Sequence, residues 1–347
     1  MSYGIVNADQ IGTSVQGYSL GAGNSSLLKN KIINGACVID QRNAGASVTP
    51  TTAQYLVDRW KAVLSASGKY TAQQNAGSVT PPAGFVNYLG FTSTSAYSIS
   101  ATDQFYNTQI IEGYNIADLG WGTANAKTVT LSFQVYSSLT GTFGGSFQNS
   151  AQDRCYPFSY TISSANTWTT ISVTIAGDTT GTWLTTTGVG IRVIFSLGTG
   201  STYSATAGSW TSTNFITSAT GATSVVGTSG ATFYITGVQL EVGSSATGFE
   251  YRQYGQELAL CQRYYAILTT PIQYAGFASG AATVSGMIYF PTTMRAAPTV
   301  GGTVTASNSA ASGVRNITSQ GAGIYTDTGS SNNTSVTLTT GTAASEL

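Results

Sequence analysis

The sequence contains no histidine, and this absence narrows the chemistry that its side chains can perform. Ser-His-Asp and Cys-His nucleophile activation and the usual zinc sites are excluded. Hydrolysis of glycosidic bonds remains open, since it needs two carboxyl groups at a fixed separation across the bond. The carboxylates that we consider for this role are Asp103, Glu112, Asp118, Asp153 and Asp178. No spacing rule selects a pair among them, so we predict that the chain is not an enzyme, with a carbohydrate-active enzyme as the alternative.

Aromatic side chains are better candidates for a functional role. Sugar rings stack on the faces of Trp and Tyr, while amides and carboxylates bind the sugar hydroxyls. Several aromatic residues lie in or beside polar, glycine-containing stretches, and the candidates for glycan stacking are Trp121, Trp168, Trp183, Trp210, Tyr106 and Tyr114. A large Trp in a β-sandwich also packs in cores and subunit interfaces, so both roles stay open for each residue.

We predict neither a cofactor nor a metal. The 41 glycines include no Walker-type loop with its lysine and no glycine fingerprint that joins a strand to a helix, so we interpret them as turn formers. Asp40 and Glu241 raise the possibility of a structural calcium, but this ion needs six to eight oxygen ligands. We favour the simpler interpretation that Glu241 points outward from a strand beside Gln239.

Composition excludes several classes of partner. Charged residues make up 7% of the chain, against roughly 25% in an ordinary soluble protein. The 13 basic residues balance the 13 acidic ones without clustering, which argues against nucleic acid and anionic membranes as partners. No apolar run approaches the length of a membrane span, so we expect no membrane insertion. The cysteines Cys37, Cys155 and Cys261 are odd in number and far apart, which predicts buried thiols in a reducing cytoplasm.

Most of the chain has the pattern of short strands. Val129, Leu131, Phe133 and Val135 alternate with polar residues, and residues 171–175 and 189–195 repeat this pattern. Such strands, separated by Gly, Ser, Thr and Asn clusters, predict an all-β, antiparallel sandwich. We predict a jelly roll over residues 31–252. Residues 233–242 would close it, with a kink or bulge at Gly237 where the apolar parity changes.

Three further segments complete the predicted organisation. Leu258, Cys261, Tyr265 and Leu268 recur at three- and four-residue steps, which predicts a linking helix over residues 253–270 that ends at Pro271. Residues 271–347 predict a small β domain with so thin a core that it buries surface against copies of itself. Residues 1–30 show no helical stripe or heptad, and we expect an extended arm for attachment or oligomerisation.

Three separated motifs give the sequence a family resemblance. They comprise residues 233–250 with the helix at 257–265, residues 34–45 with 55–60, and residues 290–298 with the final 344–347. In this order they resemble tail-fibre-like virion structural proteins of tailed bacteriophages. The motifs also contain Arg42, Arg59, Arg263 and Arg295, which we expect to cap strand ends or to pair with carboxylates such as Asp58.

The resemblance implies both a fold and a role. The fold is a jelly roll similar to carbohydrate-binding modules, and the role is a homotrimeric tail fibre or fibre-like appendage that contacts host surface polysaccharide. The N-terminal arm would bind other virion proteins, of the tail or of the capsid. The chain would be made in the host cytoplasm and would reside in the virion. A capsid decoration or head-fibre protein is the alternative within the same structural class.

Overall fold

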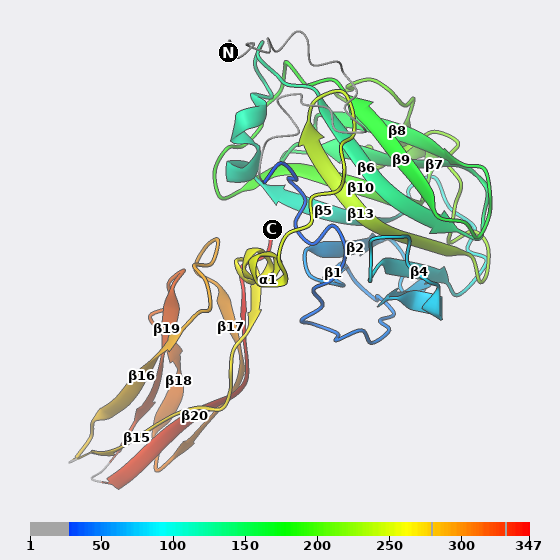
Figure 1. Cartoon of the computed structure of the whole chain (residues 1–347). Helices are drawn as coiled ribbons and strands as arrows, with labels where there is room; N and C mark the ends of the chain where they lie inside the picture. The colour runs from blue at the N-terminus through cyan, green and yellow to red at the C-terminus, as the bar shows by residue number, and fades with distance from the viewer. Residues whose placement is uncertain (1–27, 279, 330–331) are drawn as a thin grey trace, which may run out of the picture.

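The computed structural model describes residues 28–278, 280–329 and 332–347. The arm predicted for residues 1–30 lies outside the described residues, apart from residues 28–30. A large β unit and a small one follow each other along the chain, with the short helix α1 (Tyr254–Gln262) beside their junction (Figure 1). In the part of the chain that is described, no helix is long and apolar enough to cross a membrane.

The large unit is an all-β jelly roll built from two antiparallel sheets, which confirms the predicted fold class. The six-stranded sheet has the order β1-β2-β5-β10-β7-β8, with bounds Gln54–Tyr55, Trp60–Leu64, Gln104–Glu112, Val189–Thr199, Gly141–Gln148 and Cys155–Ile162. The five-stranded sheet has the order β3-β4-β13-β6-β9, with bounds Tyr70–Gln74, Leu89–Ser93, Thr232–Val242, Val129–Ser137 and Thr169–Ile175. Short elements complete the unit: 3-10 helices η2 (Ala76–Ser78), η3 (Gly113–Leu119) and η4 (Ser201–Tyr203), and the parallel pair β11 (Ser204–Ala205) and β12 (Ser218–Ala219).

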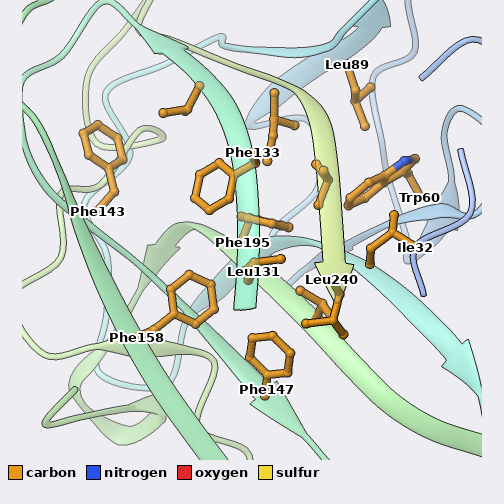
Figure 2. Close-up of a cluster of buried hydrophobic side chains, with 14 of the residues drawn as sticks. Ile32, Trp60, Leu89, Leu131, Phe133, Phe143, Phe147, Phe158, Phe195 and Leu240 are labelled. Atoms are coloured by element: carbon orange, nitrogen blue, oxygen red, sulfur yellow. The ribbon is translucent and has the colours of Figure 1, made fainter. Parts of the chain in front are cut away.

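The core lies between these two sheets and is rich in aromatic rings. Phe133 of β6 meets Phe195 of β10 with ring centroids 5.1 Å apart, in the edge-to-face geometry that aromatic pairs favour. Figure 2 shows both side chains within the cluster of buried hydrophobic residues. The alternation predicted for residues 129–135 is therefore confirmed as one buried strand face. The predicted buried thiols are confirmed as well, because Cys37, Cys155 and Cys261 are free and buried.

The predicted irregularity at Gly237 is a β-bulge. The pairing of β13 with β6 runs to Thr236 and resumes at Gln239, which shifts the register between them. Gly237 has a φ of 61°, and a Cβ there would lie 2.6 Å from the ring of Phe85. Only glycine satisfies both constraints. The bulge turns both apolar parities of the strand inward, which buries Phe233, Ile235, Val238 and Leu240.

The linking helix is shorter than the predicted 253–270. Helix α1 ends at Gln262, and Tyr265 already belongs to strand β14 (Tyr265–Ile267), which pairs with the last strand of the chain. The prediction was wrong because the residues at helical spacing belong to different elements. Leu258 and Cys261 lie in α1, whereas Tyr265 lies in β14. Within residues 265–270 the buried side chains are Ala266 and Leu268, which alternate as in a strand.

The small unit is a second β-sandwich with a thin core. Its strands β15, β16, β17, β18, β19 and β20 span Ile272–Ala278, Thr283–Tyr289, Thr299–Ser307, Ala311–Arg315, Gly321–Asp327 and Asn332–Ala344. Strand β20 pairs with β14, β15 and β17, whereas β19 lies between β16 and β18. Large apolar side chains stay exposed on this unit, among them Phe277 and Tyr289. Burial of this surface against further copies stays a prediction.

Arginine–carboxylate contacts join the two units. Glu112 at the end of β5 is buried and accepts hydrogen bonds of 2.9 and 2.7 Å from Arg263 and of 2.7 Å from the Tyr264 hydroxyl. Arg42 and Arg59 both bind Glu346 beyond the end of β20. Arg295 donates to the backbone carbonyls of Thr187, Ser345 and Glu346. These contacts confirm the structural role that the sequence predicted for the four arginines.

Candidate functional site

A cavity of about 440 Å³ opens between the 3-10 helix η3 and the first described residues of the chain. This volume falls within the range of small-ligand pockets. Its lining residues are Leu28, Asn30, Lys31, Ile33, Tyr114, Asn115, Ala117, Asp118, Arg252 and Leu260. Amide, carboxylate, ammonium and aromatic groups thus surround one space.

Helix η3 forms one wall because its sequence, GYNIADL, has the period of a 3-10 helix. Gly113, Ile116 and Leu119 are buried at three-residue steps, which is the repeat of this helix type. Gly113 approaches the backbone so closely that a Cβ would lie 2.4 Å from the Leu184 carbonyl oxygen. The buried face anchors the helix, and Tyr114, Asn115, Ala117 and Asp118 are left exposed on the other side.

The opposite wall is fixed by hydrogen bonds of its own. The Asn30 side chain accepts from the backbone N–H groups of Ile32 at 2.9 Å and Leu240 at 3.0 Å. Arg252 donates to the carbonyl oxygens of Asn30 and Ile32. The ammonium of Lys31 reaches across the cavity to both carboxylate oxygens of Asp118, at 2.8 and 2.9 Å. The site is therefore held in place before any ligand binds.

This arrangement suits a polar ring with hydroxyl groups. The Tyr114 side chain is 59% exposed, so much of its surface is free for stacking. Asn115 supplies both a donor and an acceptor. The Asp118 carboxylate is half exposed, and an exposed ion pair such as the one it forms with Lys31 contributes little to stability. These groups match the stacking surface and hydrogen-bonding partners that a sugar requires.

Of the six aromatic residues predicted from the sequence, Tyr114 lines this cavity. Trp121, Trp183 and Trp210 instead pack against one another, with ring centroids 4.7 to 5.4 Å apart and interplanar angles of 78 to 81°. Each indole N–H donates to a backbone carbonyl, of Lys127, Thr180 and Ala176 respectively. Because Trp121 and Trp183 are buried within this trio, we assign the three residues to packing rather than to the candidate site.

Trp168 and Tyr106 lie elsewhere on the large unit. Trp168 packs between Tyr88 and Tyr136 on the outer face of the five-stranded sheet, at 5.4 and 5.5 Å, and donates to the Thr80 carbonyl. Tyr106 is buried in β5 of the six-stranded sheet. Neither residue lines the cavity, so the structure does not gather the predicted aromatic residues into one platform.

Each of the five candidate carboxylates has a hydrogen-bond or ion-pair partner of its own. Glu112 and Asp178 form ion pairs with Arg263 and Arg154, and Asp153 accepts from Asn149. Asp103 accepts from Ser65, Tyr97 and the backbone N–H of Ser100. Of these five residues, Asp118 is the one that lines the cavity.

The pKa values of two of these carboxyl groups, Asp103 and Asp178, are lowered, whereas a general acid needs a raised pKa. Burial raises the pKa of Asp103, but hydrogen bonds from Ser100, Ser65 and Tyr97 outweigh it and hold the pKa below its usual range. Burial acts in the same way on Asp178, where the hydrogen bonds of Arg154 and Thr180 hold the pKa low. A glycosidase acid needs the opposite shift.

The residues weighed for calcium are satisfied locally. Asp40 accepts from the backbone N–H groups of Asn43 and Gly45, and Glu241 accepts from the backbone and hydroxyl of Thr247. Glu241 does point away from the core beside Gln239, but it is buried, because the segment that contains Thr247 folds back over it. Among the described residues, no group of three or more acidic or cysteine side chains could hold a metal ion.

Sequence reasoning missed most of the cavity. Asn30, Lys31 and Arg252 come from segments far from η3 in the chain, and no local pattern connects them. One signal was available, because the three-residue repeat of Gly113, Ile116 and Leu119 marks a short amphipathic helix that presents Tyr114 and Asn115.

No family model matches the sequence, and no curated protein matches it either. Among solved structures, the chain is similar to the enzymatically active domain of tailspike protein 4 from bacteriophage CBA120 (11% identity, 62% of this chain, TM-score 0.32). It is also similar to a putative sugar-binding protein from Bacteroides thetaiotaomicron (12% identity, 62% of this chain and 100% of that one, TM-score 0.36). The family 11 carbohydrate-binding module from Clostridium thermocellum, in complex with a mixed-linked tetrasaccharide, gives 10% identity, coverages of 58% and 97%, and a TM-score of 0.29. The match spans 22% of the tailspike chain, and these likenesses concern the fold alone.

Proposed function

We propose that this chain is a structural protein of a phage virion, a trimeric tail fibre or fibre-like appendage that binds host surface glycans in the η3 cavity. The observation that carries the proposal is the convergence of the exposed Tyr114 ring, the Asn115 amide and the Asp118 carboxylate in one pre-formed cavity. The phage-fibre resemblance of the three sequence motifs supports the place of the chain in the virion.

Binding without catalysis is the proposed activity. A glycosidase places two carboxyl groups on either side of the scissile bond, at about 5–10 Å from each other. In the cavity, Asp118 is paired with Lys31, and the other four candidate carboxylates have structural partners elsewhere in the large unit. A capsid decoration protein would need no such cavity, and for this reason we favour an appendage that contacts the host.

The proposed mechanism is multivalent stacking. A sugar ring packs on Tyr114, and its hydroxyls exchange hydrogen bonds with Asn115 and Asp118. One such site binds weakly, because few atoms are in contact. Three copies on one homotrimer raise the effective concentration of each further site, so the assembled appendage binds a glycan-covered surface far more tightly than one chain.

The test is binding of the full-length protein to an array of bacterial surface oligosaccharides, compared with the Tyr114→Ala variant. We expect wild-type binding to specific saccharides and a roughly tenfold loss in the variant, because the stacking surface is removed. Tyr114→Phe keeps the ring and should retain binding. Tyr254→Ala is the matched control, since Tyr254 is an exposed tyrosine (64%) that does not line the cavity. Loss of binding in the control but not in Tyr114→Ala would overturn the assignment, as would an array without any bound saccharide.

A further inference from the structure

The outer face of the six-stranded sheet carries a group of cationic and phenolic side chains away from the η3 cavity. Lys61 of β2 lies opposite Thr108 of β5, and Arg192 of β10 lies opposite Ile110 of β5. Tyr106 is two residues before Thr108, so its side chain is on the same face of the sheet. The register therefore brings Lys61, Tyr106 and Arg192 to one surface, with β5 between the two cations.

These two cations have no anionic partner. Within the part of the chain that is described, no carboxylate lies at ion-pair distance from Lys61 or Arg192, and the Arg192 Nε is buried without a hydrogen-bond partner. The nearby Glu346 is already bound by Arg42 and Arg59. Buried charges normally have a partner, because leaving one without compensation is costly.

Electrostatics show that the charges affect each other. Burial lowers the pKa of Lys61, and the charge of Arg192 lowers it further, while Glu346 acts in the opposite direction. Burial also lowers the pKa of Arg192, while Tyr106 and Tyr55 act in the opposite direction. Burial raises the pKa of Tyr106, so its hydroxyl keeps its proton at neutral pH. An anion at this surface would relieve the repulsion between the two cations. It would accept hydrogen bonds from an ammonium, a guanidinium and a phenolic hydroxyl.

We infer that Lys61, Tyr106 and Arg192 form a binding site for the carboxylate of an acidic sugar unit. A guanidinium presents donors in a planar fork that matches a carboxylate, while an ammonium and a phenol can bind the same oxygens from other directions. This inference rests on the proposed function, because the saccharide is what would carry the carboxylate. It adds a ligand class to that function: glycans that contain uronic acids.

The test is calorimetric titration of the full-length protein with oligogalacturonate, with the neutral galactose oligomer and with inorganic phosphate. We expect oligogalacturonate to bind, and Arg192→Gln and Lys61→Gln each to weaken it by at least about tenfold, since hydrogen bonds to charged groups are the strong ones. Lys69→Gln is the matched control, because Lys69 stacks on Tyr97 and likewise forms no ion pair within the described ranges. Both site variants should also melt no lower than wild type, because each removes a repulsion.

Three outcomes would overturn the inference. Unchanged affinity in both site variants would mean that these residues do not contact the ligand. A lower melting temperature in both would indicate a structural role instead. Phosphate binding as tight as oligogalacturonate would assign the site to inorganic anions. The Tyr114→Ala variant separates this inference from the proposed function: it should lose binding of neutral saccharides and retain the effect of Arg192→Gln on the acidic one.

Discussion

At the scale of single residues, charge is scarce and is used mainly to hold the chain together. Glu112, Asp58 and Arg59 are almost completely buried, although such residues usually lie at the surface. Glu112 and Arg59 find their partners across the joint between the two β units. Because breaking a buried ion pair leaves an uncompensated charge, these residues fix where the units meet.

Asp58 gives this part of the molecule a pH dependence. It accepts hydrogen bonds from the backbone and side chain of Gln41 and lies 3.6 Å from Arg42, yet burial raises its pKa to about 6. The unfolded value is about 4, so the folded state binds the proton more tightly. Protonation therefore stabilises the fold below about pH 4, and this contribution is lost as pH rises through about 6.

We expect the free energy of unfolding to contain a contribution from Asp58 that falls by about 2 kcal/mol between pH 4 and pH 7. Urea unfolding of wild type and Asp58→Asn at both pH values measures it, because the difference between the two proteins isolates this group. The same pH dependence in both proteins would contradict the assignment.

The roles of single residues could be predicted from the sequence where they follow from the small number of charged side chains. They could not be predicted where they depend on segments that meet only in the folded chain. The four motif arginines had to find partners in a chain with few charges, and they do. Trp121, Trp183 and Trp210 lie in polar, glycine-containing stretches that suggest exposed loops. Their packing against one another is invisible in the sequence, because it arises from loops that meet only in the folded chain.

At the scale of elements, the strands follow from period-two alternation, and the exceptions follow from tertiary pairing. The segment 233–242 and its bulge at Gly237 were predicted because a parity change within one strand needs an extra residue. The end of helix α1 was not predicted correctly. The apolar residues keep a helical spacing beyond it, but residues 265–267 form strand β14 because they pair with β20. The residues of the cavity wall at 28–33 and 252 were missed because they too are brought into place by contacts between distant segments of the chain.

Gly145 of β7 provides a test of close packing between strands. A Cβ at this position would lie 2.2 Å from the Ile194 carbonyl oxygen and 2.4 Å from the buried ring of Phe158. Because the first neighbour is backbone, we expect Gly145→Ala to lower the free energy of unfolding by about 3 kcal/mol. The matched control is Gly248→Ala, where nothing lies within 4 Å of the added Cβ. Chemical denaturation of both variants checks this, and equal stabilities would show that β7 can shift.

At the scale of the whole molecule, the chain places its η3 cavity on the large unit and its exposed apolar side chains on the small one. Phe277 and Tyr289 are 68% and 77% exposed, which supports the proposal that this unit contacts other copies. Figure 1 shows the small unit extending away from the jelly roll. The arrangement of the units depends on contacts such as Glu112 with Arg263, between residues far apart in sequence. No periodicity could have predicted it.

The most direct test of the central claim is the release rate of the full-length protein from a sensor coated with its array-selected glycan, at dense and at sparse coverage. On the dense surface, a site that dissociates can rebind a nearby glycan while the other two sites of the trimer hold the protein. Release there should therefore be at least about a hundredfold slower than on the sparse surface. Equal release rates at both densities would contradict multivalent glycan binding, and so would the absence of retention at either density.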